Sequence, residues 1–273
     1  MQSIESLSEK VDRRLQRLCR HAHVHITDRG NAAIFLAMYI AKRMNPRPDI
    51  IIPDQGGWFS YRTYPQFFNY NVVEVKTDHG VIDLQDLKKK AKTASALIFS
   101  SFAGYFAEQP LRKITTLCKK AGCLVIEDAS GAIGDTKLCN GKYADIIVGS
   151  FGKGKPVEYG YGGWISTNEK GYLENVRDAM SLTKVHPQFY KEILAHLRKN
   201  KLKKLLVLQQ KVKQDLEAFD VLHRDKRGLN VVVKFDPQVL EYCQKNGYPY
   251  VLCPSYIRVH ERAVSIELKR LPL

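Results

Sequence analysis

The chain has 273 residues, of which 44% are hydrophobic and 10% aromatic, and its formal net charge is +15. This composition excludes an intrinsically disordered chain and predicts one large domain with a smaller appendage, while the charge favours an anionic substrate or partner. No run approaches the ~18 apolar residues that cross a bilayer, and the stretch after Met1 contains Glu5 and Glu9 in place of a basic, then apolar, leader, so we expect a cytoplasmic protein without a membrane partner.

Strands and helices alternate along the first 168 residues. Near-continuous runs of isoleucine and valine predict strands at 23–26, 49–54, 71–77, 95–102, 123–129, 145–151 and 162–168. Helical periodicity ended by proline or glycine predicts helices at 31–44, 84–92 and 110–122. Such runs, separated by helices, are typical of a parallel sheet that is covered on both faces. We therefore predict an α/β fold with a mostly parallel sheet and helices on both faces.

From residue 169 the pattern changes to helix and then to a short α+β region. A long helical segment is expected over roughly 188–219, followed by short strands at 230–235, 249–253 and 263–268. The change predicts a large α/β domain at 1–180 and a smaller unit at 181–273, made of the long helix and a small C-terminal α+β region.

Much of the positive charge lies in "LRKNKLKKLLVLQQKVKQ" (197–214), where leucines and a valine fall close to helical spacing between lysines. The segment is typical of the solvated face of a long amphipathic helix. A phosphate-binding face, and hence a nucleic-acid partner, is the alternative. Charge is the only feature that supports this alternative, so nucleic acid is not the expected partner.

The cysteines are spaced without a C-x-x-C motif, which indicates reduced thiols and predicts neither a disulfide framework nor a metal site. They are Cys19, Cys118, Cys123, Cys139, Cys243 and Cys253.

Ligand sites in open α/β sheets collect at the carboxyl ends of the strands. The first predicted strand is followed by Gly30 and by a helix that begins at Asn31 and Ala32, whose free amides can bind a phosphate. An ordinary turn is the alternative. The strand at 123–129 ends in Asp128, whose carboxylate needs a partner such as an arginine, backbone amides, a metal or a protonated heterocycle, unless it caps the next turn.

The strand at 145–151 leads into "GSFGKGKPVEYGYGG" (149–163), where Lys155 follows Ser150 by five residues. The flanking glycines let the backbone turn sharply and can aim an ammonium over the strand ends. A partly desolvated lysine favours its neutral amine and can form a Schiff base with an aldehyde, whereas a solvated loop charge is the alternative for both Lys153 and Lys155. A phosphate-binding helix start, a carboxylate and a lysine together are the protein groups that pyridoxal phosphate requires.

Four segments carry a resemblance to a known family. They are "RGNAAI" (29–34), "PDQGGW" (53–58), "AEQPLRKI…VIEDASGAIG" (107–134) and "GSFGKGKPVEYGYGGWISTNE" (149–169). In order and spacing they are similar to the motifs SGT-x-AL, P-x-x-x-(W/F), GQPADMDAI…VIEDAAQA-x-G and FSF-x-x-x-K…GEGG-x-(I/V)-x-TND of the DegT/DnrJ/StrS-type aminotransferases. These are fold-type-I pyridoxal phosphate enzymes that act mostly on keto-sugar nucleotides, and the resemblance covers roughly residues 25–180.

The resemblance implies a role for each candidate residue. Lys155, not Lys153, would form the Schiff base and shuttle the proton, and Asp128 would keep the pyridine nitrogen protonated. Trp58 would stack on the ring, while Asn31, Ala32 and Ser150 would bind the phosphate. The resemblance further implies a homodimer, an anionic small-molecule acceptor such as a keto-sugar nucleotide, and an amino acid donor.

Two positions depart from the family pattern. Gly131 stands where the family has a glutamine, and Tyr161 replaces the glutamate of GEGG. The chain is also abbreviated at both ends relative to the family, and the family's asparagine-and-arginine loop is not found. A catalytically degenerate protein that keeps the fold for binding or assembly therefore stays open as an alternative function.

Overall fold

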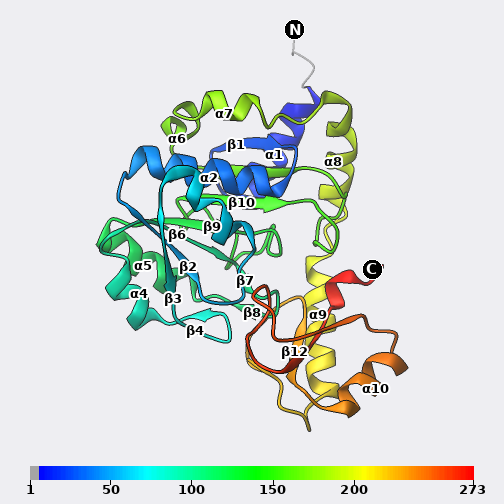
Figure 1. Cartoon of the computed structure of the whole chain (residues 1–273). Helices are drawn as coiled ribbons and strands as arrows, with labels where there is room; N and C mark the ends of the chain where they lie inside the picture. Colours follow the sequence, from blue (N-terminus) through cyan, green and yellow to red (C-terminus); the bar gives the residue numbers. More distant parts are fainter. Residues whose placement is uncertain (1–5) are drawn as a thin grey trace.

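A computed structural model describes residues 6–273 of the chain (Figure 1). Its strands are β1 (His23–Thr27), β2 (Asp49–Pro53), β3 (Asn71–Val75), β4 (Thr77–Asp78), β5 (Val81–Ile82), β6 (Ala94–Ser100), β7 (Phe102–Ala103), β8 (Ala107–Glu108), β9 (Leu124–Asp128), β10 (Ile146–Ser150), β11 (Gly163–Thr167), β12 (Val231–Lys234), β13 (Tyr250–Leu252) and β14 (Ala263–Ile266). Its α-helices are α1 (Leu7–Cys19), α2 (Gly30–Met44), α3 (Ser60–Thr63), α4 (Leu84–Lys90), α5 (Leu111–Ala121), α6 (Lys170–Glu174), α7 (Arg177–Ser181), α8 (Tyr190–Arg198), α9 (Leu202–Asp215) and α10 (Pro237–Lys245).

A seven-stranded sheet in the order β1-β11-β10-β9-β6-β2-β3 forms the centre of the molecule. The pairs from β10 to β3 are parallel, and only β11 runs antiparallel to its two neighbours, β10 and β1. All seven strands coincide with predicted ones to within a few residues. The predicted α/β fold with a mostly parallel sheet is confirmed.

Helices cover both faces of this sheet because successive strand residues point to opposite sides. In β2, Ile50 and Ile52 pack against α2, whereas Ile51 joins the core beneath α1, α4 and α5. In β10, Val148 likewise packs in the core on the α2 side, and Ile147 packs in the core on the opposite face. The continuous apolar runs in the sequence therefore reflect strands that are buried on both faces.

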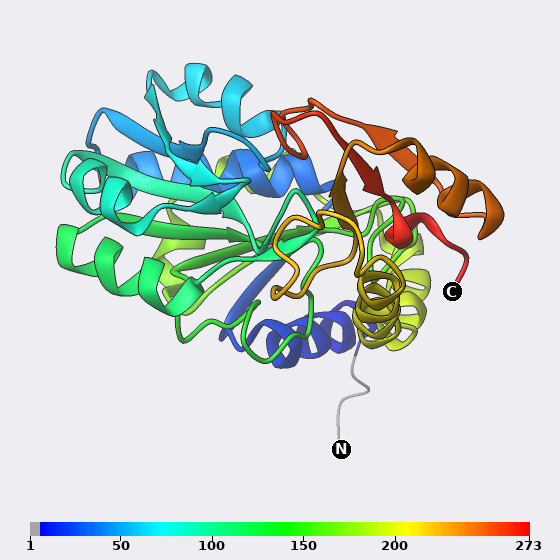
Figure 2. The same ribbon diagram turned by 90° about the horizontal axis from the view of Figure 1, so that it is seen from below.

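The C-terminal region adds a separate three-stranded sheet in the order β12-β14-β13, with α10 and its own hydrophobic core. Figures 1 and 2 show this region at one end of the molecule, beyond α9. Helix α9 contributes Leu205 to the core of the large sheet and Val212 to the C-terminal core. The domain boundary near residue 181 stays a prediction.

The continuous helix predicted over 188–219 is wrong, because the chain forms α8 and α9 with a break at 199–201. Asn200 lies in the break: its amide donates to the Ile133 carbonyl (2.8 Å) and its side-chain oxygen accepts from Leu202 N–H (2.9 Å). An asparagine that satisfies backbone groups in this way competes with the helical hydrogen bonds.

Helix α1 and the two short hairpins, β4–β5 and β7–β8, were not predicted. Within residues 6–273, none of the helices combines the length and the apolar character that a membrane crossing requires. The six cysteines all lie in the described part of the chain and are buried as free thiols.

Gly149 allows the strand that carries Ser150 to pack against its neighbour. A Cβ built at Gly149 would lie 1.9 Å from Cη2 of the fully buried Trp164. The indole of Trp164 stacks on Phe151 with ring centroids 5.1 Å apart, so it cannot easily withdraw. The end of β10 therefore depends on a glycine at this position.

We predict that Gly149→Ala lowers the free energy of unfolding by about 3 kcal/mol or more, because an added methyl overpacks a closed core. Urea unfolding measures the effect. The control is Gly171→Ala in α6, where no described residue other than its chain neighbours and the backbone of its own helix lies within 4 Å of the added Cβ, and it should be neutral or slightly stabilising. Equal stability of the two variants would show that the Trp164 contact does not constrain β10.

Candidate active site

A cavity of about 680 Å³ lies where the carboxyl ends of the central strands meet the start of α2. Five of the predicted site residues line it: Asn31, Trp58, Asp128, Ser150 and Lys155. Ala32 is not among the described residues that line the cavity, but it belongs to the first turn of α2. The structure therefore brings together residues that are spread over more than 120 positions of the sequence.

The first turn of α2 faces Ser150 at very short range. A Cβ built at Gly30 would lie 2.5 Å from Cβ of Ser150, so only glycine permits this approach. Arg29, the N-cap residue, makes no side-chain cap to the described part of the helix, and the first backbone amides have no intrahelical acceptor. An uncapped helix start at a cavity can bind an anion such as phosphate.

Asn31 holds the indole of Trp58 in place. Nε1–H of Trp58 donates to Oδ1 of Asn31 (2.9 Å), and Oγ of Ser60 donates to the same oxygen (3.1 Å). The Asn31 side-chain oxygen is thus engaged with protein donors. The fixed indole lies near Lys155, whose Nζ is 5.5 Å from the centre of the Trp58 ring.

Asp128 lies at the cavity with two hydrogen-bond donors. The hydroxyl of Tyr61 donates to Oδ2 (2.7 Å), and the amide of Ser130 donates to Oδ1 (2.9 Å). Burial raises the pKa of Tyr61 well above its usual range, so Tyr61 remains a neutral donor. The preceding Glu127 points to the opposite face of the sheet, where its Oε1 accepts from Ser101 (2.6 Å). The alternation of β9 therefore leaves Asp128 as the carboxylate of the cavity.

Lys155 is 9% exposed, and its Nζ donates to the hydroxyl of Tyr105. Burial lowers the pKa of Lys155 to about 8, with Asp128 opposing and Arg258 assisting the shift. A lysine with this pKa is neutral in roughly one molecule in ten at pH 7, about 300-fold more often than an ordinary lysine. The neutral amine is the nucleophilic form of a lysine. Lys153 also lines the cavity, but its side chain is exposed.

Tyr105 and a charged group from the C-terminal region complete the site, and the sequence did not predict them. Glu267 is fully buried and accepts from Nε and one Nη of Arg258, both at 2.7 Å. Nζ of Lys269 lies 3.6 Å from Oε2 of Glu267 and 4.6 Å from the centre of the Tyr105 ring. Arg258 and Lys269 both line the cavity, which brings two cations of the C-terminal region to the strand ends.

The burial of this group shifts its pKa values. Burial tends to raise the pKa of Glu267, but the hydrogen bonds and charge of Arg258 outweigh burial and lower it to about 2. Burial lowers the pKa of Lys269 to about 7, with Glu267 opposing and Lys155 assisting. The C-terminal region therefore contributes to the cavity the guanidinium of Arg258 and the amine of Lys269, whose pKa is about 7.

The two departures from the family pattern have local explanations. A Cβ built at Gly131 would lie 3.3 Å from the ring of Tyr105 and 3.2 Å from Leu229, so the space for a larger side chain is taken. Tyr161 packs on Phe189 with ring centroids 4.5 Å apart. Tyr105 therefore lies where a longer residue at 131 would extend.

The family model of the DegT/DnrJ/EryC1/StrS aminotransferases matches residues 5–207. A second model, that of the MJ1341 family C-terminal domain, matches residues 199–273. No curated protein sequence is significantly similar to the chain.

Several solved structures share the fold over nearly the whole chain. 3-Amino-5-hydroxybenzoic acid (AHBA) synthase has a TM-score of 0.75 at 14% identity, covering 96% of this chain and 85% of its own. Helicobacter pylori PseC, an aminotransferase involved in the biosynthesis of pseudoaminic acid, has a TM-score of 0.74 at 16% identity, covering 96% and 86%. Bacillus subtilis NtdA with bound cofactor PMP has a TM-score of 0.73 at 15% identity, covering 97% and 73%. Identities this low establish similarity of fold.

We predict a pH-dependent stability difference between the cofactor-free parent and Lys155→Met. Below about pH 8 the folded and unfolded parent both carry the proton on Lys155, and the cost of the buried ammonium is fully present. Between pH 8 and 10.5 only the unfolded state keeps the proton, so the parent gains stability as the pH rises. The advantage of the methionine variant should shrink across this range by up to about 3 kcal/mol.

Urea unfolding at pH 7 and pH 10 tests this expectation. Lys153→Met, which removes an exposed lysine from the same loop, is the control and should follow the parent at both pH values. A difference between Lys155→Met and the parent that stays constant with pH would contradict the lowered pKa of Lys155.

Proposed function

The chain belongs to the DegT/DnrJ/EryC1/StrS aminotransferase family, and from this premise we propose that it transfers an amino group from an amino acid donor to an anionic carbonyl substrate such as a keto-sugar nucleotide. Membership identifies the chain as an enzyme of the aminotransferase type with pyridoxal phosphate as its cofactor. The observation that carries the proposal is the buried Lys155 beside Trp58 and Asp128 at the strand ends.

The residues of the cavity fit this cofactor. Its lining combines an uncapped helix start, an indole held by Asn31, a buried carboxylate and a buried amine. We propose that the amides of Asn31 and Ala32 bind the phosphate together with Ser150, and that Trp58 covers one face of the ring. Asp128 would pair with the ring nitrogen, and Lys155 would form the Schiff base.

When bound, the cofactor supplies an electron sink for the carbanion that forms at the donor carbon. The contribution of Asp128 is a negative charge that keeps a proton on the ring nitrogen, and Tyr61 and Ser130 hold its two oxygens in place. Lys155 contributes an amine whose lowered pKa, about 8, lets it both accept and donate a proton near neutral pH. Tyr105 positions that amine through its hydroxyl.

The charge of the cavity supports an anionic substrate. Arg258, Lys269 and Arg270 from the C-terminal region line it, as do Arg29 and Lys153. Positive side chains around a concave site attract and orient anionic ligands. Arg258 is already paired with Glu267. Phosphate or carboxylate groups on the acceptor would therefore pair with the exposed Arg29, Lys153 and Arg270.

The catalytically degenerate alternative is supported by Gly131 and by the direct contact between Tyr105 and Lys155. A protein of this kind would keep the cofactor-binding fold without turnover. The Asp128 experiment described below separates the two functions, because only an enzyme has a reaction rate to lose.

The homodimer and the cytosolic location stay proposals. Phe59 and Phe67, near Trp58 in sequence, are 54% and 64% exposed and could be covered by a second copy. The free thiols agree with a reducing compartment. In α9, Lys213 points inward and donates to backbone carbonyls of residues 223, 224 and 226, whereas Lys203, Lys204 and Lys211 are exposed. Exposed charge remains the only feature of α9 that favours a nucleic-acid partner, so we do not propose one.

We predict that borohydride reduction of the cofactor-loaded protein attaches the pyridoxyl group to Lys155, because its amine is buried at the cavity whereas Lys153 is exposed. Peptide mapping by mass spectrometry identifies the modified residue. Lys153→Ala should keep the label and Lys155→Ala should lose it. Label on Lys153 alone would refute the assignment of the reactive lysine.

We predict that Asp128→Asn slows the half-reaction with glutamate by orders of magnitude, because an amide cannot hold the ring nitrogen protonated. Single-turnover absorbance of the cofactor measures the rate, and a melting curve measures stability. Tyr61→Phe is the matched control, since it removes a hydrogen bond to Asp128 but keeps the carboxylate, and it should cost about 1 kcal/mol of stability with a much smaller loss of rate. An Asp128→Asn variant that melts early yet reacts at the parental rate would remove Asp128 from the reaction.

A further inference from the structure

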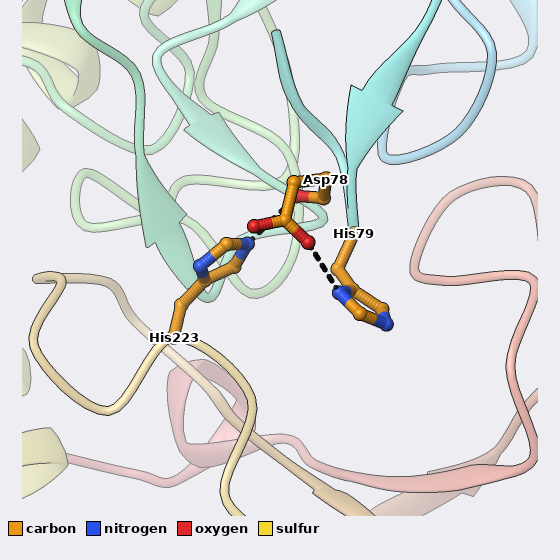
Figure 3. A group of neighbouring side chains, drawn as sticks. All are labelled: Asp78, His79 and His223. Carbon is orange, nitrogen blue, oxygen red and sulfur yellow. Dashed lines mark hydrogen bonds and ion pairs between the residues drawn. The ribbon is translucent and has the colours of Figure 1, made fainter. Parts of the chain in front are cut away.

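A cluster of three potential metal ligands lies outside the active-site cavity. Asp78 and His79 belong to the β4–β5 hairpin, and His223 lies in the loop that follows α9 (Figure 3). One ligand atom from each side chain falls within 4.8 Å of the others, and no other such group was found among residues 6–273. His223 is 145 residues from Asp78 in sequence, so only the fold brings it beside the adjacent pair Asp78 and His79.

Both histidines sit at unusual backbone positions. His79 and Gly80 have φ values of 45° and 90°, which form a two-residue hairpin turn that normally selects asparagine or glycine. His223 has a φ of 48°. A left-handed conformation at a non-glycine residue costs roughly 1–3 kcal/mol and is often kept for the placement of a functional side chain.

The loop of His223 is held rigidly. The ammonium of Lys213 donates to the carbonyl of His223 (2.9 Å), and Arg224 donates to the carbonyls of Lys213 (2.9 Å) and Phe219 (2.6 Å). The ring of His223 stacks on Phe106 with centroids 5.8 Å apart. A site whose ligands are fixed in advance loses little entropy when it binds an ion.

The contacts of the His79 imidazole match those of a metal ligand. Nδ1 of His79 faces Oδ1 of Asp78 (2.8 Å), while its Nε2 contacts Oε2 of Glu261 (2.6 Å). Nε2–H of His223 donates to the backbone carbonyl of Asp78 (2.7 Å), so this hydrogen bond must break and the proton must move to Nδ1 when Nε2 binds an ion. A metal-ligating histidine usually bonds a carboxylate through its other ring nitrogen, and Glu261 supplies that carboxylate.

We propose that Asp78, His79 and His223 bind one divalent transition-metal ion of the Zn²⁺ type. The ligands would be a carboxylate oxygen of Asp78, Nδ1 of His79 and Nε2 of His223, with water in the remaining position. Zinc requires ligands about 2.0–2.2 Å away, so the side chains must close slightly around the ion. The Asp78 side chain is 75% exposed and free to make this adjustment.

Two imidazoles and one carboxylate select zinc over magnesium or calcium, which prefer oxygen ligands throughout. The bound ion would connect the β4–β5 hairpin, beside the large sheet, to the loop between α9 and β12. It would therefore stabilise the attachment of the C-terminal region, whose Arg258 and Lys269 line the active site.

Zinc titration of the purified full-length protein tests the proposal. Isothermal titration calorimetry, with metal analysis after dialysis, should give one Zn²⁺ per chain for the parent and none for the variant that carries both His79→Ala and His223→Ala. His186→Ala is the matched control and should bind like the parent, because His186 lies outside the cluster. Glu261→Gln should bind about 10–100-fold more weakly, as expected for a residue that orients a ligand.

Three results would overturn the assignment. They are no binding by the parent at micromolar Zn²⁺, unchanged binding by the double variant, and equally tight binding of Mg²⁺. Zinc should raise the melting temperature of the parent but not that of the double variant. If the double variant does not fold, Asp78→Asn, which alters one exposed carboxylate, replaces it and should show the same loss of zinc binding.

Discussion

The burial of the Lys155 amino group at the carboxyl edge of the sheet constrains most of the surrounding structure. An ammonium removed from water costs several kcal/mol unless charge or hydrogen bonds compensate it. Asp128 and Glu267 supply negative charge, and the Tyr105 hydroxyl accepts one hydrogen bond from the ammonium. Because this compensation is incomplete, the pKa of Lys155 falls to about 8 and a larger fraction of the amine is neutral at pH 7. The incompletely compensated burial of Lys155 destabilises the folded state. The lowered pKa that results is also the chemical feature that most clearly indicates a function for the chain.

The C-terminal region completes the cavity because it adds charged side chains to those that the large domain supplies. Arg258, from the loop before β14, and Lys269, which follows β14, both line the cavity, and Glu267 pairs with Arg258 behind it. Glu267 has no exposed surface and is fixed by Arg258, Ser265 and Asn230, so the position of the group is well defined. A truncation that removed β14 would therefore open the cavity and also change the electrostatic environment of Lys155.

The sequence predicted the large sheet, the helix start at Asn31, Asp128 and Lys155 because their signals are local, whereas Trp58 and the phosphate role of Ser150 followed only from the resemblance to the family. A strand end, a glycine and a charged residue lie within a few positions of each other at Asp128 and at Lys155. Tyr105, Arg258 and His223 gave no such signal, since their partners lie far along the chain. Helix α1 is different: its capping box at Ser6 and Glu9 and the buried Val11 and Leu15 were present in the sequence and could have been recognised. The break at Asn200 depends on the Ile133 carbonyl, which only the fold brings near.

The turn that joins β7 to β8 places two adjacent residues at different sites. Tyr105, with a φ of 69°, directs its hydroxyl to Lys155, while Phe106 packs on the ring of His223. The segment at 228–230 fixes this turn: the amides of Leu229 and Asn230 both donate to the Tyr105 carbonyl (2.7 and 3.0 Å), and a Cβ at Gly228 would lie 2.3 Å from the Phe106 carbonyl oxygen. A displacement of the His223 loop must therefore move the same turn that positions the Lys155 amine. The His223 loop and the Lys155 amine thus contact adjacent residues of the same turn.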